Sequence, residues 1–378
     1  MNDRTPAEAF APGEILRDEL EVRGWTQTEF AQILGRPVQV VNEIISAKRG
    51  ITPETAKAFA AALGTSAQLW MNLESSYQLS KADPAPERIS REAKLREKFP
   101  LREMVKRGWI EPSDERGEIE ARLCRFFHLQ SIDDPISLPH AAKRSVGKDE
   151  AGEPLSSIQM AWLFRVKQIA AAMQVNAYSE KALRDALPQL EALTTEPEEA
   201  RRVARILADC GVRFVIVEPV PGSKIDGVCF WVNGNRSPVI GMTLRFDRND
   251  NFWFVLRHEI EHVLRKHGQL AMIIDELGAG DGSASAVTDE ERIANEAAQE
   301  FCVPKREMDD FIARTRPFFS EEKIVRFARR IHRHPGIVIG QLQHRIEKRD
   351  HLNKLKIKIR QHVTSSALTD GWGQTAAI

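Results

Sequence analysis

The segment His258-Glu259-Ile260-Glu261-His262 constrains the fold of this chain more than any other five residues. Residues i and i+4 are neighbours on an α-helix, so both imidazoles reach one Zn²⁺ only if this segment is helical. Glu259 would then lie beside the ion as a candidate general base for a bound water molecule. The apolar residues of the same segment, which predict a largely buried helix beginning near residue 250, are Phe252, Val255, Leu256, Val263 and Leu264.

Burial is what favours a metal site over an exposed charged helix face. A buried His–Glu–His group needs partners, and a metal ion supplies them. The charged neighbours that would suit the exposed face are Arg257, Glu261, Arg265 and Lys266. A catalytic zinc takes three protein ligands and leaves one position for water. From the residues alone the third ligand is not decided, and the candidates are His267, Asp289, Glu290, Glu291 and His334.

The first 80 residues predict a domain of five short helices. Thr26-Gln27-Thr28-Glu29 has the form of a capping box, and the helix that it opens ends at Gly35. Pro12, Thr52-Pro53 and Ser66 mark the starts of other helices.

Residues 26–34, 35–36 and 37–46 have the spacing of a helix-turn-helix, which lets the second helix enter a major groove. Gln and Asn can pair with adenine, Arg can pair with guanine, and Lys and Arg can contact phosphates. The alternative is a small helical module that binds protein, which the net charge of −3 (7 Lys+Arg and 10 Asp+Glu in residues 1–80) favours. The residues expected at or near DNA are Arg36, Gln39, Val40, Asn42, Lys48 and Arg49.

Residues 12–79 resemble the HigA-type antitoxin family of helix-turn-helix (XRE-like) proteins. The resemblance rests on the strings PGEILRDEL, WTQTEFAQILG, VNEIISAKRGITPETA and ALGTSAQLWMNLESSYQL. It implies a homodimer that binds double-stranded operator DNA, with residues 37–46 as the recognition helix. Val38 and Val40 stand where basic or polar residues are common in that family, so the resemblance does not imply an operator sequence.

Residues 212–342 resemble the ImmA/IrrE metallopeptidase family, which joins H-E-x-x-H to a downstream E-x-x-A-x-x-x-A helix. Here that helix contains Glu291, Ala294, Ala298 and Pro304. The resemblance implies a zincin-like fold with zinc as cofactor and Glu291, rather than its neighbour Glu290, as the third ligand. The family usually has Gly before the second His, where this chain has Glu261.

Strand signals appear at residues 212–217, 227–232 and 238–246. We therefore expect an α+β chain: a helix-turn-helix domain over residues 1–80, a helical linker or spacer over 81–210, a mainly helical peptidase-like domain with a small three-stranded sheet over 211–363, and a flexible tail over 364–378.

Composition and cysteine spacing indicate the cellular compartment of the protein. The four cysteines are far apart, with no C-x-x-C pair, which fits a reducing cytosol. No apolar run is long enough for a membrane span, and the N-terminus lacks the apolar core of a signal peptide, so we expect a cytoplasmic protein that binds no membrane. Residues 316–362 carry 13 Lys+Arg and 4 Asp+Glu, which indicates either phosphate contacts or a solvated helix face.

These features predict a DNA-binding regulator with a zinc-dependent peptidase domain. The resemblance implies a substrate that is a regulatory protein such as a repressor, or this chain itself. The alternative is a non-enzymatic antitoxin or repressor with a structural or sensory metal site. A third possibility is a helix-turn-helix that binds a cognate toxin while it still binds its operator.

Overall fold

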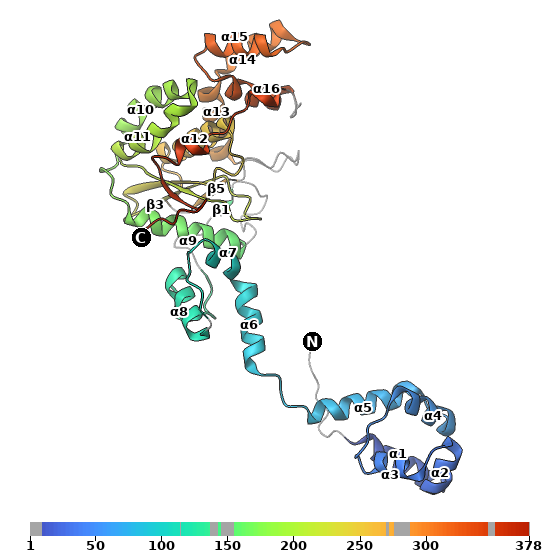
Figure 1. Ribbon diagram of the computed structural model, residues 1–378. Coiled ribbons are helices and arrows are strands. Elements are labelled where there is room, and N and C mark those ends of the chain that lie inside the picture. Colours follow the sequence, from blue (N-terminus) through green and yellow to red (C-terminus); the bar gives the residue numbers. More distant parts are fainter. Residues whose placement is uncertain are drawn as a thin grey trace. The chain divides into compact units, whose positions relative to one another are not determined.

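The computed structural model describes residues 10–113, 115–136, 143–144, 155–269, 272–275, 288–346 and 352–377. The chain divides into two compact units, Met1–Ser90 and Arg91–Ile378, which Figure 1 shows in ribbon form. The first unit is all helical and the second contains helices and a sheet, so the α+β prediction is confirmed. Among the described helices, none combines the length and apolar character needed to cross a membrane.

The first unit contains the five predicted helices. Thr26 accepts a hydrogen bond from the backbone N–H of Glu29, whose carboxylate in turn accepts the backbone N–H of Thr26, as expected of a capping box. Thr52 and Ser66 cap two further helices in the same way. The core of this unit packs around Phe30, Phe59 and Trp70. The helices are α1 (Pro12–Arg23), α2 (Gln27–Leu34), α3 (Val38–Ile45), α4 (Pro53–Leu63) and α5 (Ala67–Lys81).

The second unit consists of helices around one mixed sheet. Its helices are α6 (Glu87–Lys98, which begins in the first unit), α7 (Leu101–Lys106), α8 (Arg116–Phe127), α9 (Ser157–Ala172), α10 (Glu180–Ala192), α11 (Val203–Asp209), α12 (Asn249–Leu264), α13 (Asp289–Cys302), α14 (Lys305–Thr315), α15 (Glu321–Arg330), α16 (Pro335–Ile346) and α17 (Arg360–Val363), with short 3₁₀ turns at Leu193–Thr195, Pro197–Arg202 and Asn353–Leu355. Its strands are β1 (Lys143–Arg144), β2 (Arg213–Val217), β3 (Gly227–Val232), β4 (Ser237–Met242), β5 (Ile273–Asp275) and β6 (Leu368–Asp370).

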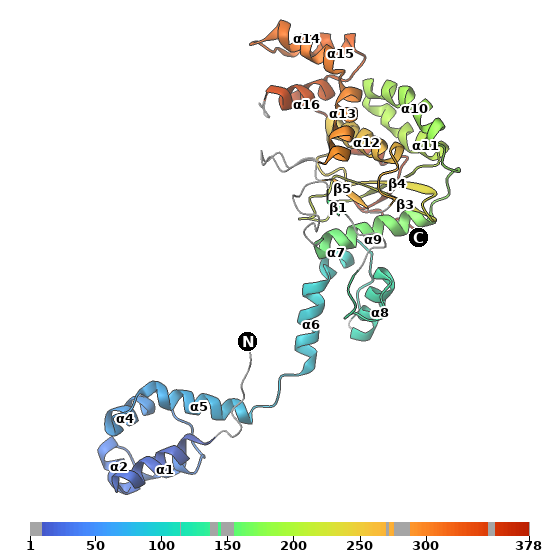
Figure 2. The ribbon, with the colours of Figure 1, turned by 180° about the vertical axis from the view of Figure 1, so that it is seen from behind.

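The sheet separates two apolar layers, with the strand order β1-β5-β3-β4-β2-β6. β3 pairs antiparallel with β4 and β5, whereas β2 pairs parallel with β4 and β6. Successive side chains of a strand point to opposite faces. On β2, Phe214 and Ile216 pack with α10, α11 and α12, while Val215 and Val217 pack with α9. Figures 1 and 2 show α9 on one side of the sheet and α12 on the other.

The sheet is larger than the sequence predicted, because the described residues form six strands rather than three. The three expected strands are β2, β3 and β4, and the three added strands are only two or three residues long. Strands this short carry no alternating pattern that a sequence can reveal.

Residues 81–210 are not a separate spacer between two domains. Helix α9 lies within this range, and its buried residues Trp162, Leu163 and Val166 cover one face of the sheet. The compact second unit accordingly begins at Arg91 rather than near residue 211.

The expected flexible tail instead completes the sheet. Leu368–Asp370 pairs with β2, and the Asp370 carboxylate is fully buried. It accepts hydrogen bonds from the Arg165 guanidinium (Nε at 2.9 Å), from Trp109 Nε1 at 2.7 Å and from the backbone N–H of Ala376 at 3.1 Å. A buried guanidinium needs a counter-charge, and Asp370 supplies it. The prediction of a flexible tail was therefore wrong.

Candidate metal centre and helix-turn-helix surface

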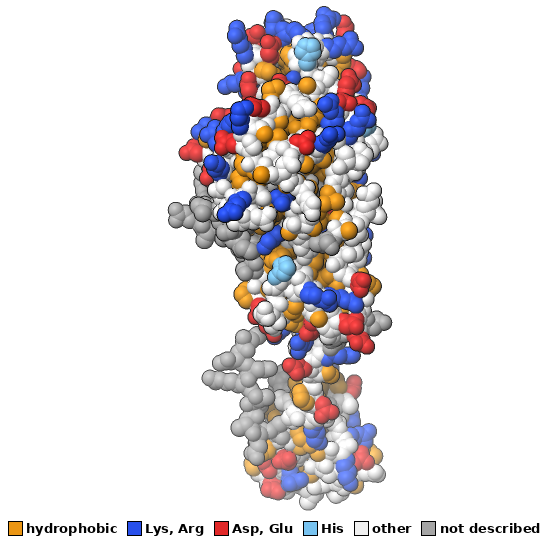
Figure 3. Space-filling model, turned by 90° about the vertical axis from the view of Figure 1, so that its left-hand side faces the viewer, with side chains coloured by type: hydrophobic (Ala, Val, Ile, Leu, Met, Phe, Trp, Pro, Cys, Tyr) orange, Lys and Arg blue, Asp and Glu red, His pale blue; other side chains and the backbone are white. Residues whose placement is uncertain are grey.

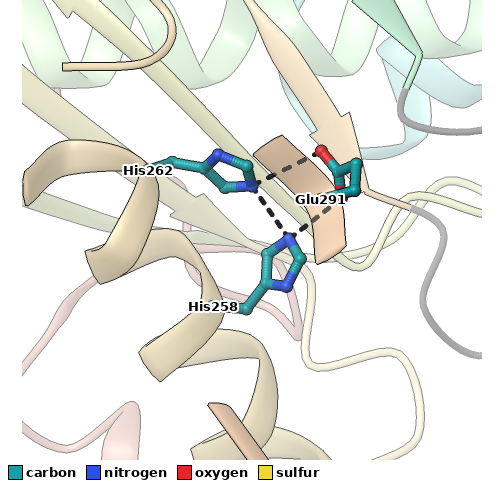
Figure 4. A group of neighbouring side chains, drawn as sticks. All are labelled: His258, His262 and Glu291. Atoms are coloured by element: carbon teal, nitrogen blue, oxygen red, sulfur yellow. Dashed lines mark hydrogen bonds and ion pairs between the residues drawn. The ribbon is translucent and has the colours of Figure 1, made fainter. Parts of the chain in front are cut away.

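Helices α12 and α13 bring three of the predicted residues together at one point (Figure 4). The Nε2 atoms of His258 and His262 lie 2.9 Å apart. His258 Nε2 is 3.3 Å from Glu291 Oε2, and His262 Nε2 is 3.5 Å from Glu291 Oε1. His258 and His262 are fully buried and Glu291 is 3% exposed. Two imidazoles and a carboxylate thus converge in the interior of the protein.

The local sequence explains why Glu291 is held there. Thr288 is the N-cap of α13, and its hydroxyl accepts a hydrogen bond from the backbone N–H of Glu291 at 3.3 Å. This cap fixes the first turn of α13 and with it the position of Glu291. Ala294 and Ala298 follow at helical spacing and are fully buried, which lets α13 pack against α12.

The residues fit a zinc ion. Two ligand atoms bound to a tetrahedral zinc at about 2.0–2.1 Å lie about 3.3 Å from each other. The three distances here are 2.9, 3.3 and 3.5 Å. Each facing atom of a neutral imidazole or a carboxylate can offer a lone pair, and burying such a group costs free energy unless it is compensated. One divalent cation would compensate all three.

Glu259 lies on α12, the helix of His258 and His262, and is also fully buried. Its carboxylate lies against β3, where a Cβ atom added to Gly227 would be 2.0 Å from Glu259 Oε1. Only glycine at position 227 leaves room for the carboxylate in this position. The sequence placed Glu259 beside the ligands but gave no sign that Gly227 makes space for it.

His267, one of the open candidates for the third ligand, contacts His262 instead. Its Nδ1 lies 2.9 Å from Nδ1 of His262. Burial lowers the pKa of His267, which favours a neutral ring whose Nδ1 can accept a hydrogen bond. His262 would then donate from Nδ1, which leaves the lone pair of its Nε2 for the metal position between His258, His262 and Glu291. Such outer partners orient metal-binding histidines.

Glu261, which replaces the usual glycine, points to a separate cluster. Its carboxylate is 2.8 Å from Arg257 Nη2 and 2.8 Å from Arg265 Nε. Burial acts to raise the pKa of Glu261, but the hydrogen bonds from Arg265 and Arg257 outweigh it and lower the pKa. The residue therefore takes part in an ion-pair cluster on α12, where its carboxylate stays charged.

The remaining candidates for the third ligand lie outside the cluster. Asp289 and Glu290 are exposed, and Asp289 forms an ion pair with Arg292. His334 accepts a hydrogen bond from the backbone N–H of Gly336.

In the first unit, the six residues expected at DNA do not all behave alike. Gln39, Asn42, Lys48 and Arg49 are exposed on or just after α3. Arg36 is half-buried and donates to the Thr55 hydroxyl, while Val40 is half-buried against the core, so these two contribute to packing of the unit.

Glu43 is a residue of this surface that the sequence did not single out. It accepts a hydrogen bond from Gln39 Nε2 at 3.0 Å and pairs with Arg49 at 3.1 Å. Its spacing of four residues from Gln39 was the available signal, since such positions are neighbours on a helix. Any contact of Gln39 with a base would have to replace this hydrogen bond.

The basic segment after residue 316 is largely neutralised by acids where it is described. Arg326 is paired with Glu322, and Arg330 with Glu307. Figure 3 shows basic and acidic side chains next to one another at the end of the second unit where α14 and α15 lie. This arrangement favours the solvated helix face over a phosphate-binding surface.

Two parts of the chain match known protein families. Residues 16–70 match the helix-turn-helix family, and residues 211–347 match the IrrE N-terminal-like domain, an M78 peptidase family. Virulence-associated protein I of Dichelobacter nodosus is 36% identical over 83 residues, which are 22% of this chain and 77% of that protein. The uncharacterized HTH-type transcriptional regulator YddM of Escherichia coli is 28% identical over 72 residues, 19% of this chain and 77% of that protein. The chain belongs to the helix-turn-helix family through its N-terminal unit, and its second unit contains a domain that matches the IrrE N-terminal-like (M78 peptidase) family.

Solved structures similar to the first unit include HigA-type antitoxins. Antitoxin HigA of Pseudomonas aeruginosa, solved with the higBA promoter, is 39% identical over 20% of this chain and 82% of that chain, with a TM-score of 0.19. An addiction module antidote protein of the HigA family from Coxiella burnetii is 33% identical over 20% of this chain and 83% of that chain, also with a TM-score of 0.19.

Proposed function

We propose that this protein is a transcriptional regulator whose first unit binds operator DNA as a homodimer and whose second unit is a zinc-dependent endopeptidase. The substrate would be a regulatory protein such as a repressor, or the chain itself. The observation that carries the proposal is the buried His258, His262 and Glu291 cluster with Glu259 on the same helix.

His258, His262 and Glu291 would hold the zinc through Nε2 atoms and a carboxylate oxygen. When bound, zinc polarises a carbonyl group and lowers the pKa of water. Glu259 is not one of the three converging ligands, and its carboxylate would accept the proton of the attacking water. It would then donate that proton to the leaving amine. Burial of the whole group excludes bulk water and strengthens these interactions.

The test uses Glu259→Gln in the full chain. This change keeps the size of the side chain and the three ligands, and it removes only the group that accepts the proton. Loss of general-base help costs about 10²–10⁴ in rate. We expect Glu259→Gln to have normal zinc content by elemental analysis. Wild-type cells under DNA-damaging stress should show new protein N-termini, either in a repressor or in residues 81–100 of this chain. Cells with Glu259→Gln should show none of these N-termini.

Glu296→Gln is the matched control, because Glu296 is an exposed residue of α13 that pairs with Arg292. It should behave as wild type. Identical N-termini and identical reporter output for wild type and Glu259→Gln would refute the peptidase. The non-enzymatic antitoxin would then stand, and a cognate toxin would be sought by co-purification.

DNA binding rests on the exposed residues of α3 and has its own test. Gln39→Ala should weaken specific binding by roughly 1–3 kcal/mol if Gln39 reads a base edge. Footprinting upstream of the gene at moderate salt is the assay. Absence of a protected palindrome would indicate that the first unit binds protein, such as a toxin, instead.

A further inference from the structure

A cavity lies outside the His258, His262 and Glu291 cluster, at the end of the β3–β4 hairpin. It has a volume of about 310 Å³, which is within the range of small-molecule sites, about 300–1,000 Å³. Its lining is mostly apolar and includes Ala171, Phe230, Val232 and Met272. The turn at Asn233–Asn235 also lines it, and all three of its residues have positive φ.

The lining includes one charged residue. Lys167, on α9, is half-buried, and its Nζ lies 5.8 Å from the centre of the Phe164 ring. Among the residues that the structure describes, no carboxylate pairs with it. Burial lowers the pKa of Lys167, because the ammonium loses hydration. A positive group in an apolar cavity is a binding element for an anion.

We propose that this cavity binds a small organic anion with an apolar body, whose acidic group pairs with Lys167 and whose body packs on Phe230 and Met272. The acid group would supply a counter-charge for Lys167, and the apolar body would replace water on the lining. No residue of the proposed peptidase site is needed for this binding.

The cavity adjoins the segment that carries His267. Trp231 and Gly268 line it, and Trp231 Nε1 donates to the backbone oxygen of His267 at 2.9 Å. A Cβ on Gly268 would meet the backbone oxygen of Cys229 at 2.7 Å, so this segment lies tightly against β3. An occupant would therefore contact residues that position the partner of His262. The expected coupling to zinc affinity rests on the proposed zinc site.

The test is titration of the full chain with anilinonaphthalene sulfonate, a fluorescent dye that has an aromatic body and an acidic group. We expect one dye per chain, and Lys167→Met should weaken binding at least tenfold, or 1.4 kcal/mol. Lys181→Met is the control, because Lys181 is 86% exposed, and it should bind as wild type. Naphthalene sulfonate should displace the dye, and neutral naphthalenemethanol should not.

Equal dye affinity in wild type and Lys167→Met, or equal displacement by both competitors, would overturn the proposal. Ala171→Trp gives an independent check if Lys167→Met does not fold, since Ala171 is an exposed lining residue whose enlargement should block the cavity. Zinc affinity measured by chelator competition with and without dye tests the coupling, which must be reciprocal. An unchanged zinc affinity would refute the coupling, and dye binding reads out the cavity even if the chain binds no zinc.

Discussion

Replacement of Asp370 by alanine should destabilise the second unit severely, although the residue lies in a segment whose sequence predicted a flexible tail. The Asp370 and Arg165 side chains are 0% and 4% exposed. Removing one partner of a buried ion pair costs about 3–5 kcal/mol, because the remaining charge is left without compensation. Trp109 Nε1 and the backbone N–H of Ala376 would lose their acceptor in the same change. We therefore expect a loss at the upper end of that range.

Hydrogen exchange measured by mass spectrometry on peptides covering β2 reports on the second unit alone, because β2 pairs with β6 there. Under conditions where these amides exchange by global unfolding, 3–5 kcal/mol corresponds to exchange about two to four orders of magnitude faster. Asp185→Ala removes an exposed pair with Lys181 and should cost at most about 1 kcal/mol. If Asp370→Ala changes stability no more than Asp185→Ala does, the segment is not anchored in solution and the reasoning is refuted.

Three further changes address the metal centre. His267→Ala should lower zinc affinity, measured by chelator competition, about 10–100-fold because it removes the partner of His262. His344→Ala, at an exposed histidine, should leave zinc affinity unchanged. Equal zinc affinities for the two variants would exclude the orienting role of His267. Gly227→Ala should retain zinc but displace the Glu259 carboxylate, and retained cleavage would show that the added methyl group is accommodated. Thr288→Ala removes the cap of α13 and should lower the free energy of unfolding, measured by urea denaturation, by about 0.5–2 kcal/mol. Thr288→Ser keeps the capping hydroxyl and should retain most of that stability.

The features that could be predicted from the sequence are those that depend on the spacing of residues close together in the chain. The i, i+4 histidines and the caps at Thr26 and Ser66 act within one or two helical turns, so their pattern is complete in a short stretch of chain. The resemblance to a metallopeptidase family, rather than spacing, indicated Glu291 among five candidates.

What sequence did not predict depends on contacts between distant segments. Gly227 and Glu259 meet only because β3 packs on α12, and Lys98 reaches the backbone oxygens of Ile132 and Asp134 only in the folded unit. Strand β6 is three residues long, and its buried carboxylate is explained by partners distant in the sequence, Arg165 and Trp109. No periodicity within either segment reveals such a pairing.

The parallel pairing of β2 with β6 also dictates an order of events during synthesis. A ribosome making this chain releases the entire first unit, ending at Ser90, before it has made any residue of the sheet. The sheet is completed only after residues 368–370 have left the ribosome and paired with residues 215–217. The helix-turn-helix can thus fold while the second unit still lacks an edge strand, so on each nascent chain the first unit should fold before the second unit is complete.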